Sequence, residues 1–346
     1  MQMHRQHPVG MSHRRFVALM AGLGAALFAL FMLSFVLGRF DVPLAQVGKI
    51  LLSRIVPMEQ TWAASMQAVV LNIRLPRILL AMLVGACLAL AGTAYQSVFC
   101  NPMAAPDILG ASSGACFGAA LAILLGLGKG GTTAFAFAMS MATVALVFLI
   151  GKQTRGARTV GILLAGVMVS SLFSSGTSYL KLVADPGDEL PAITYWLMGS
   201  LASARGSDVR FALIPMAMGA LPLLLMRWQI NLLTLSEEEA SSMGVNTSLL
   251  RVLVILCATL LTAASVAASG MIGWVGLVIP HLCRKIAGSD GRRLLPVCAV
   301  MGALFLLLVD NVSRNLAATE IPIGILTAFI GAPFFIFLMT RKENVW

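Results

Sequence analysis

Residues 16–37, FVALMAGLGAALFALFMLSFVL, form an uncharged stretch that directly follows His13-Arg14-Arg15. A helix needs about 20 mostly apolar residues to cross the hydrocarbon core of a bilayer. The apolar part of a secretory signal peptide is shorter, about 7–15 residues, and ends at a small-residue cleavage site. This stretch continues into Gly38-Arg39-Phe40 without such a site. We therefore predict a retained first membrane span, with the N-terminus in the cytoplasm because the basic residues precede it.

The whole chain has the same character as this stretch. Of its 346 residues, 59% are apolar and 11% are charged, whereas about 25% are charged in ordinary soluble domains. This composition excludes a soluble enzyme, a disordered chain and a secreted disulfide scaffold. We predict an all-α polytopic membrane protein with about ten transmembrane helices, both termini cytoplasmic, residues 1–15 as a tail and 16–346 as one membrane domain. The predicted spans are residues 16–37, 75–97, 107–128, 132–151, 160–182, 209–228, 248–268, 271–287, 295–315 and 321–340.

The formal charge is +10, from 24 Lys and Arg against 14 Asp and Glu. Nucleic-acid binding would gather the basic residues into a stripe on a folded surface. Here they are scattered between apolar stretches, which is typical of residues that orient membrane helices. The six cysteines form no CxxC pair and none stands at zinc spacing beside a histidine. They are interpreted as small packing residues, with no metal site and no nucleic-acid partner.

Three arginines lie at the predicted outer ends of spans, where the positive-inside rule disfavours them. Arg74 and Arg77 begin the second span, and Arg314 ends the ninth. They could pair with local acids such as Asp310, which precedes Arg314 by four residues and shares its helix face. They could also await an acidic partner from outside.

Residues that would couple transport to an energy source are scarce. The nearest approach to an ATP-binding loop, residues 128–132 (GKGGT), lacks the GxxxxGK[ST] spacing. Ion-driven carriers usually hold carboxylates or histidines near mid-membrane, and only Asp310 comes near a predicted span interior. No catalytic constellation is recognisable. An ion-coupled secondary carrier remains the alternative class, while a membrane enzyme lacks any residues to support it.

Three segments stand out because they combine polar and helix-breaking residues. Residues 101–110 (NPMAAPDILG) contain two prolines and place Asp107 in the first turn of the next helix, where a carboxylate offsets the helix dipole. Residues 235–245 can form a short capped helix that docks into a partner, or a solvated loop. Pro280 lies inside a span and predicts a kink. Small residues at four-residue spacing, Gly110, Gly114 and Gly118, predict a close helix-packing face.

Taken in order, six segments resemble the FecCD-type permeases, the membrane subunits of ABC importers for iron–siderophore complexes, haem and vitamin B12. The resemblance covers about residues 74–341. The segments are RLPR (74–77), NPMAAPDILGASSGA (101–115), ITYWLMGSL (193–201), LSEEEASSMG (235–244), GWVGLVIPHLCRKIAGSDGRRLLP (273–296) and EIPIGILTAFIGAPFFIFLM (320–339).

The resemblance implies a vitamin B12 permease-like fold that pairs with a second permease subunit, identical or related, around a central pathway. It implies two cytoplasmic ATPase subunits that bind ATP and Mg²⁺, so the chain is no enzyme and has no cofactor of its own. It also implies one external binding protein, periplasmic or lipid-anchored, and a place in the cytoplasmic membrane of a bacterium or archaeon. The expected cargo is a metal chelate, foremost a ferric siderophore, with haem or a cobalamin as the alternative.

The resemblance also assigns roles to residues. It implies that Arg74, Arg77 and Arg314 meet acidic residues of the binding protein, which fixes orientation and speeds docking. It implies that the loop at about residues 230–247 is the coupling helix for the ATPase. The coupling residues are Glu237, Glu238, Glu239, Ala240 and Gly244, and the cytoplasmic gate residues are Asn101, Pro102, Met103, Thr159 and Val160. In the implied transport cycle, ATP binding draws the two ATPases together, and the coupling helices pass this movement to the helices that line the pathway. The permease thereby shifts from one conformational population to another.

Overall fold

The computed structural model describes residues 11–57, 59–153, 158–235 and 237–340, and all regular secondary structure in these ranges is helical. The elements are α1 (His13–Val36), α2 (Leu44–Leu52), α3 (Ala64–Ala68), the π-helical turn η1 (Val69–Arg74), α4 (Leu75–Val98), the 3₁₀ turn η2 (Pro106–Leu109), α5 (Ala111–Leu124), α6 (Gly128–Gln153), α7 (Arg158–Val183), α8 (Glu189–Leu197), α9 (Gly206–Leu225), α10 (Gln229–Leu232), α11 (Glu237–Ser242), α12 (Thr247–Ser269), α13 (Val275–Ala287), α14 (Gly291–Asn315) and α15 (Ile323–Thr340).

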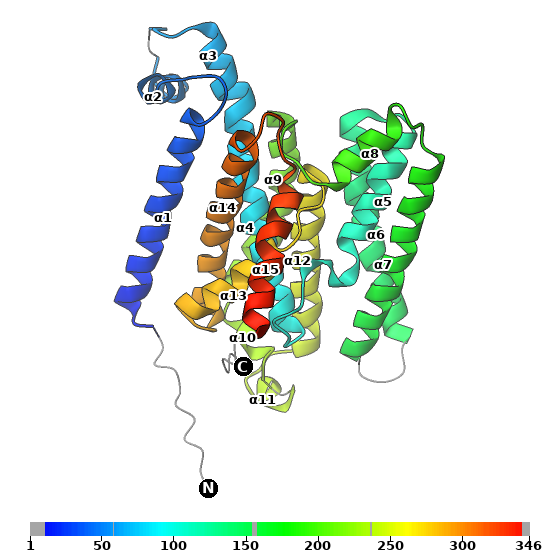
Figure 1. Cartoon of the computed structure of the whole chain (residues 1–346). Coiled ribbons are helices and arrows are strands. Elements are labelled where there is room, and N and C mark those ends of the chain that lie inside the picture. Colours follow the sequence, from blue (N-terminus) through cyan, green and yellow to red (C-terminus); the bar gives the residue numbers. More distant parts are fainter. Residues whose placement is uncertain (1–10, 58, 154–157, 236, 341–346) are drawn as a thin grey trace.

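The helices form an upright bundle with two distinct ends (Figure 1). The upper end carries α2, α3 and α8, and the lower end carries α10 and α11, together with the start of α1 and the end of α15. Seven of the described helical segments are long and apolar enough to cross a membrane. They are α1, the continuous segment Ala64–Val98 that includes α4, and α6, α7, α9, α12 and α14.

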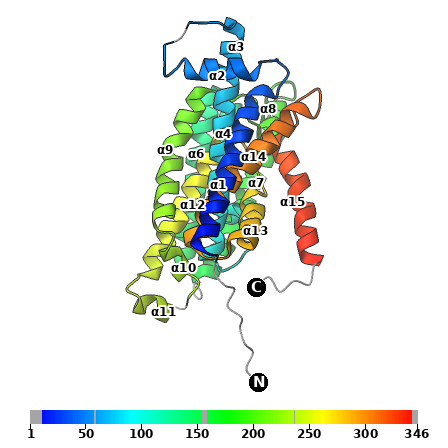
Figure 2. The same cartoon turned by 90° about the vertical axis from the view of Figure 1, so that its left-hand side faces the viewer.

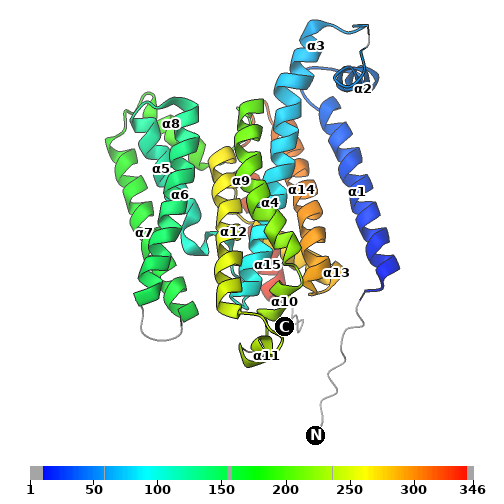
Figure 3. The same ribbon diagram turned by 180° about the vertical axis from the view of Figure 1, so that it is seen from behind.

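Helix α4 is the core of the bundle, since most of its residues are buried. It packs against α9, α12, α13 and α14, while α5, α6 and α7 form a second group that contacts this core through α12. Helix α1 lies on the opposite flank, against α14 (Figures 1 and 3). The two groups are therefore joined at α12, and α7 and α15 keep broad exposed faces.

The predicted spans 107–128 and 271–287 are wrong in extent. They correspond to α5 and α13, of 14 and 13 residues, which are about 20 Å long against the 30 Å of a bilayer core. After α4 reaches the lower end, the chain turns back into the bundle before η2 and α5 begin (Figure 1). Both short helices start at residues with positive φ, Gly110 at 77° and Trp274 at 70°, because the chain reverses sharply there.

Pro280 lies inside α13 and leaves one backbone carbonyl without its helical donor. That carbonyl belongs to Gly276, four residues earlier, and it accepts a hydrogen bond from Gln96 Nε2 at 3.4 Å. The Gln96 side chain also accepts a hydrogen bond from Arg284. Gln96 therefore ties α4 to both ends of α13, and the proline is accommodated by a side chain from a neighbouring helix.

The predicted small-residue face lies against α6. A Cβ on Gly114 would be 2.0 Å from Thr143 Oγ1, and one on Gly118 would be 2.4 Å from the Phe135 carbonyl oxygen. Gly110 is different, since it precedes α5 in the left-handed region and faces Ser170 of α7. Two of the three glycines thus permit close helix packing, and the third permits a turn.

Candidate functional site

At the upper end, the three arginines singled out in the sequence lie within one buried group of charges. We call Arg74, Arg77, Asp310, Arg314 and Glu320 the upper charge cluster. The arginines are 4%, 5% and 7% exposed, and Asp310 is fully buried. Of the two alternatives open from the sequence, pairing with a local acid is seen directly, since Arg314 Nε lies 3.2 Å from Asp310 Oδ2.

Arg77 has the most extensive set of ionic partners in the cluster. Its Nε lies 2.9 Å from Asp310 Oδ1, and its Nη1 donates to Glu320 Oε1 at 3.0 Å and Oε2 at 2.8 Å. Sequence reasoning missed Glu320, although its position just before a predicted outer helix end was a usable signal. Asp310 was named from the sequence as a possible acid for these arginines, but spacing supported only its pairing with Arg314, because 233 positions separate it from Arg77.

Backbone carbonyls complete the cluster. Arg74 donates to the carbonyls of Phe35 and Phe40, which fixes the end of α1 against α4. Arg39 donates in the same way to Ala317 and Ala318, at 3.1 Å to Ala317, and so holds the loop between α14 and α15. Three arginines against two carboxylates leave the cluster with one excess positive charge.

The predicted coupling segment is a short helix at the lower end (Figure 2). Ala240 is fully buried, Glu239 is exposed, and Gly244 follows α11 at φ +77° with open space where a Cβ would stand. The side chains of Glu237 and Glu238 lie outside the described residues. Nearby, Asn231 joins α10 to the start of α14 through Asp290 Oδ1 at 2.8 Å and the Gly291 amide at 2.7 Å.

The predicted gate residues lie at the lower end on different helix groups. Asn101 Oδ1 accepts the Met103 amide at 2.9 Å, which forms a tight turn after α4 with Pro102 at its tip. Met103 is 45% exposed, and Val160, at the start of α7, is 54% exposed. The Thr159 side chain lies outside the described residues. The side chains of Met103 and Val160 are therefore open to contact with a neighbouring subunit.

A groove runs beside the starts of the two short helices. It comprises two adjoining hollows, of about 170 and 360 Å³, which share Asp107, Gly273 and Trp274. The other lining residues are Leu88, Ala105, Pro106, Ile272, Gly276 and Leu277 in the first hollow, and Leu197, Met198, Met271, Gly324, Ile325 and Ala328 in the second. Asp107 is exposed to this groove and accepts a hydrogen bond from Ser112. We call this feature the central groove.

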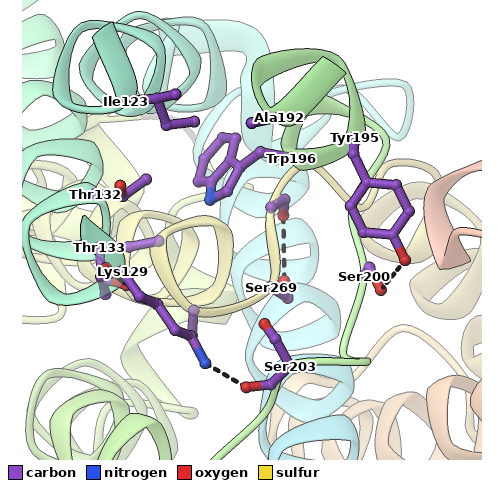
Figure 4. Close-up of a pocket in the computed structure, with 13 residues that line it drawn as sticks. Ile123, Lys129, Thr132, Thr133, Ala192, Tyr195, Trp196, Ser200, Ser203 and Ser269 are labelled. Carbon is purple, nitrogen blue, oxygen red and sulfur yellow. Dashed lines mark hydrogen bonds between the residues drawn. The ribbon is translucent and has the colours of Figure 1, made fainter. Parts of the chain in front are cut away.

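A separate pocket of about 290 Å³ lies at the upper end between α6, α8 and α12. Figure 4 shows Tyr195 bonded to Ser200, at 3.3 Å, and Lys129 reaching Ser203. Lys129 also forms an ion pair with Asp208. The lysine of the GKGGT segment is thus occupied with the start of α9, in agreement with its lack of phosphate-loop spacing.

No group of three or more His, Cys, Asp or Glu side chains suited to a metal ion occurs in the part of the chain that the structure describes. A multi-helix bundle with interrupted helices beside a groove is an arrangement found in many membrane transporters. Residues 26–341 match the model of the FecCD transport family. The chain belongs to this family, and it is the permease subunit of an ABC importer, with the ATPase in a partner subunit and no cofactor of its own.

Known relatives cover nearly the whole chain. The molybdate import system permease protein of Haemophilus influenzae is 41% identical over 323 residues, which are 93% of this chain and 95% of that protein. A probable iron chelatin transport system permease protein of Helicobacter pylori is 39% identical over 282 residues, 82% of this chain and 85% of that protein. A solved inward-facing metal-chelate type ABC transporter superposes with a TM-score of 0.84 at 39% identity, and the match covers 93% of this chain and 99% of that one.

Proposed function

We propose that this permease imports a metal chelate, foremost a ferric siderophore without net negative charge. The observation that carries the proposal is the central groove, where Asp107 faces the open space beside Trp274, Met198 and Met271. An apolar and aromatic wall suits the organic shell of a chelate. A carboxylate in the wall repels anions and attracts groups that donate hydrogen bonds. Haem and cobalamin are the alternatives of the same class.

Molybdate is a second candidate, because the relative from Haemophilus influenzae imports it and is 41% identical across 93% of this chain. Molybdate is a small oxyanion, for which proteins usually supply backbone amides or basic side chains. The charged side chain that lines the central groove is the carboxylate of Asp107. This contrast supports the chelate over the oxyanion.

The cargo is tested by reconstituting the permease in proteoliposomes with its ATPase and binding protein. A neutral ferric trihydroxamate, hemin, cyanocobalamin and labelled molybdate are offered separately, with and without ATP. We expect ATP-dependent accumulation of the ferric chelate. Accumulation of molybdate alone would overturn the cargo proposal and leave the family assignment intact, whereas accumulation without ATP along an ion gradient would contradict the ABC importer arrangement itself.

The two ends of the bundle suit the two kinds of partner in the proposed importer complex. The upper end, with its excess positive charge, faces the outside of a cytoplasmic membrane, and a binding protein docks acidic residues over Arg74, Arg77 and Arg314. The lower end, with the start of α1 and the end of α15, faces the cytoplasm, and each permease subunit binds one ATPase around α11. Acidic docking partners are supported by the net charge of the upper cluster.

A second permease subunit covers the faces of α7 and α15. Helix α7 exposes the hydroxyl residues Ser171, Ser174 and Ser178, and lipid-facing surfaces are expected to be apolar. These hydroxyls suit a wet pathway between two subunits. In such a dimer, Met103 and Val160 close the lower end together with Asn101, Pro102 and Thr159.

A further inference from the structure

Within the upper charge cluster, Glu320 differs from the other charged side chains. Its side chain is 32% exposed, whereas those of Arg77, Asp310 and Arg314 are 6%, 0% and 8% exposed. Glu320 belongs to the loop between α14 and α15, which Arg39 holds from the other side through Ala317 and Ala318. The ion pair between Arg77 and Glu320 is therefore the part of the cluster that meets the surface.

The geometry of this ion pair leaves half of the arginine fork unused. Both oxygens of Glu320 accept from the single nitrogen Arg77 Nη1, at 3.0 and 2.8 Å. Arg77 Nη2 is buried and has no hydrogen-bond partner among the described residues. A carboxylate that approached along the fork would engage Nη1 and Nη2 together, which is the stronger, bidentate arrangement.

Asp310 keeps the guanidinium in place whatever happens at Glu320. It is fully buried and bonds Arg77 through Nε, at 2.9 Å, whereas Glu320 is bonded through Nη1. The side chain of Glu320 can thus leave without freeing Arg77 to move. The excess of one positive charge means that a second carboxylate arriving from outside is electrostatically favoured.

We propose that Glu320 is an internal competitor for the docking site: it occupies Arg77 in the free permease, and an acidic side chain of the external binding protein displaces it. This inference rests on the proposed docking of the binding protein at the upper charge cluster. The permease can bind the binding protein at Arg77 only when Glu320 has left. Its apparent affinity for the binding protein is therefore the intrinsic affinity multiplied by the fraction of time that Glu320 is away from Arg77.

The test measures association of the binding protein with the permease–ATPase complex in nanodiscs. Three variants are compared with the unaltered complex: Glu320→Gln, Glu320→Asp and Glu59→Gln. Glu59 is the matched control, because it is an exposed glutamate in the loop before α3 and forms no ion pair in the described structure. We expect Glu320→Gln to bind the binding protein about two- to fivefold more tightly, the range of a partly exposed ion pair.

We expect the gain to lie in the association rate, with Glu320→Asp and Glu59→Gln within twofold of the unaltered complex. Unchanged or weaker binding by Glu320→Gln overturns the competitor proposal. An equal gain with Glu59→Gln also overturns it, because the gain would then come from removing any negative charge from the outer surface. Docking itself is judged separately with Arg77→Lys and Arg77→Gln. If both bind as well as the unaltered complex, the docking proposal fails as well.

Discussion

Asp310 is the residue on which the upper charge cluster depends, because it is fully buried and contacts two arginines from two helices. Replacing Asp310 by Asn would leave Arg77 and Arg314 buried without a full counter-charge. Breaking a buried ion pair by removing one partner costs about 3–5 kcal/mol. We therefore expect Asp310→Asn to lower the melting temperature of the purified permease markedly.

The matched comparison is Glu320→Gln, which removes a partly exposed carboxylate from the same cluster and is expected to cost about 1 kcal/mol or less. Both variants are measured by thermal unfolding in the same detergent. Equal melting temperatures for the two would show that burial of Asp310 does not decide the stability of the cluster.

Individual residues also show where sequence reasoning reached its limit. The pair of Asp310 with Arg314 was open to prediction because an i, i+4 spacing on one helix brings them together. The bonds of Arg77 to Asp310 and Glu320 cross from α4 to α14 and to the loop after it. Such contacts depend on how helices pack, and no local spacing encodes them.

At the scale of elements, α4 packs closely against the start of α13 at Gly92. A Cβ on Gly92 would lie 1.9 Å from the Gly276 carbonyl oxygen. Gly92→Ala must push the two helices apart and disturb the bond between Gln96 and that carbonyl. We expect a loss of about 1–3 kcal/mol, the usual cost of overpacking a core.

Gly22→Ala is the control, since Gly22 is a helical residue of α1 with no atom within 4 Å of its Cβ position. The same substitution there is expected to stabilise the helix by about 0.5–1 kcal/mol. Opposite shifts in melting temperature would support the packing argument, and a neutral Gly92→Ala would contradict it.

The coupling proposal for α11 is tested at Gly244, whose φ is +77° and whose Cβ position is open. A valine there is strained by the backbone alone, whereas asparagine tolerates the left-handed region. We expect Gly244→Val to reduce the binding-protein-stimulated ATP hydrolysis of the reconstituted complex by severalfold, and Gly244→Asn to retain most of it. Full activity of Gly244→Val would mean that the end of α11 does not position the ATPase.

Element lengths show a second limit of the sequence. Long apolar helices such as α1, α12 and α14 were predicted within a few residues, because apolar length alone specifies them. The stretch around α5 is also apolar, but its first residues form the turn η2. The stretch around α13 begins with residues 271–274 outside any helix and carries Arg284 and Lys285 in its last turn. Buried irregular backbone is possible there because neighbours such as Gln96 supply the missing hydrogen bonds.

At the scale of the whole molecule, the central groove is the place where we propose that a charged side chain, Asp107, contacts the cargo. Asp107 lies in the first turn of η2, in the helix-start position predicted from the sequence, and it also faces open space shared by α8, α13 and α15. Its place in a groove could not be read from its neighbours in the chain, because loops far apart in the sequence form the opposite wall. The family includes importers of several kinds of cargo, and the residues that line the central groove are the basis on which we choose among them.

If Asp107 selects against anionic cargo, its neutralisation should widen selectivity and leave transport itself intact. We expect Asp107→Asn to raise ATP-dependent uptake of an anionic ferric chelate severalfold, because the substitution removes a carboxylate from the groove wall. Uptake of a neutral ferric trihydroxamate should stay unchanged, and Asp107→Glu, which keeps the charge, should behave as the unaltered protein. The measurement is the ratio of the two uptake rates in proteoliposomes, with each binding protein present in saturating amount. A ratio that does not move with Asp107→Asn would remove the groove carboxylate from cargo selection and place that selection with the binding protein.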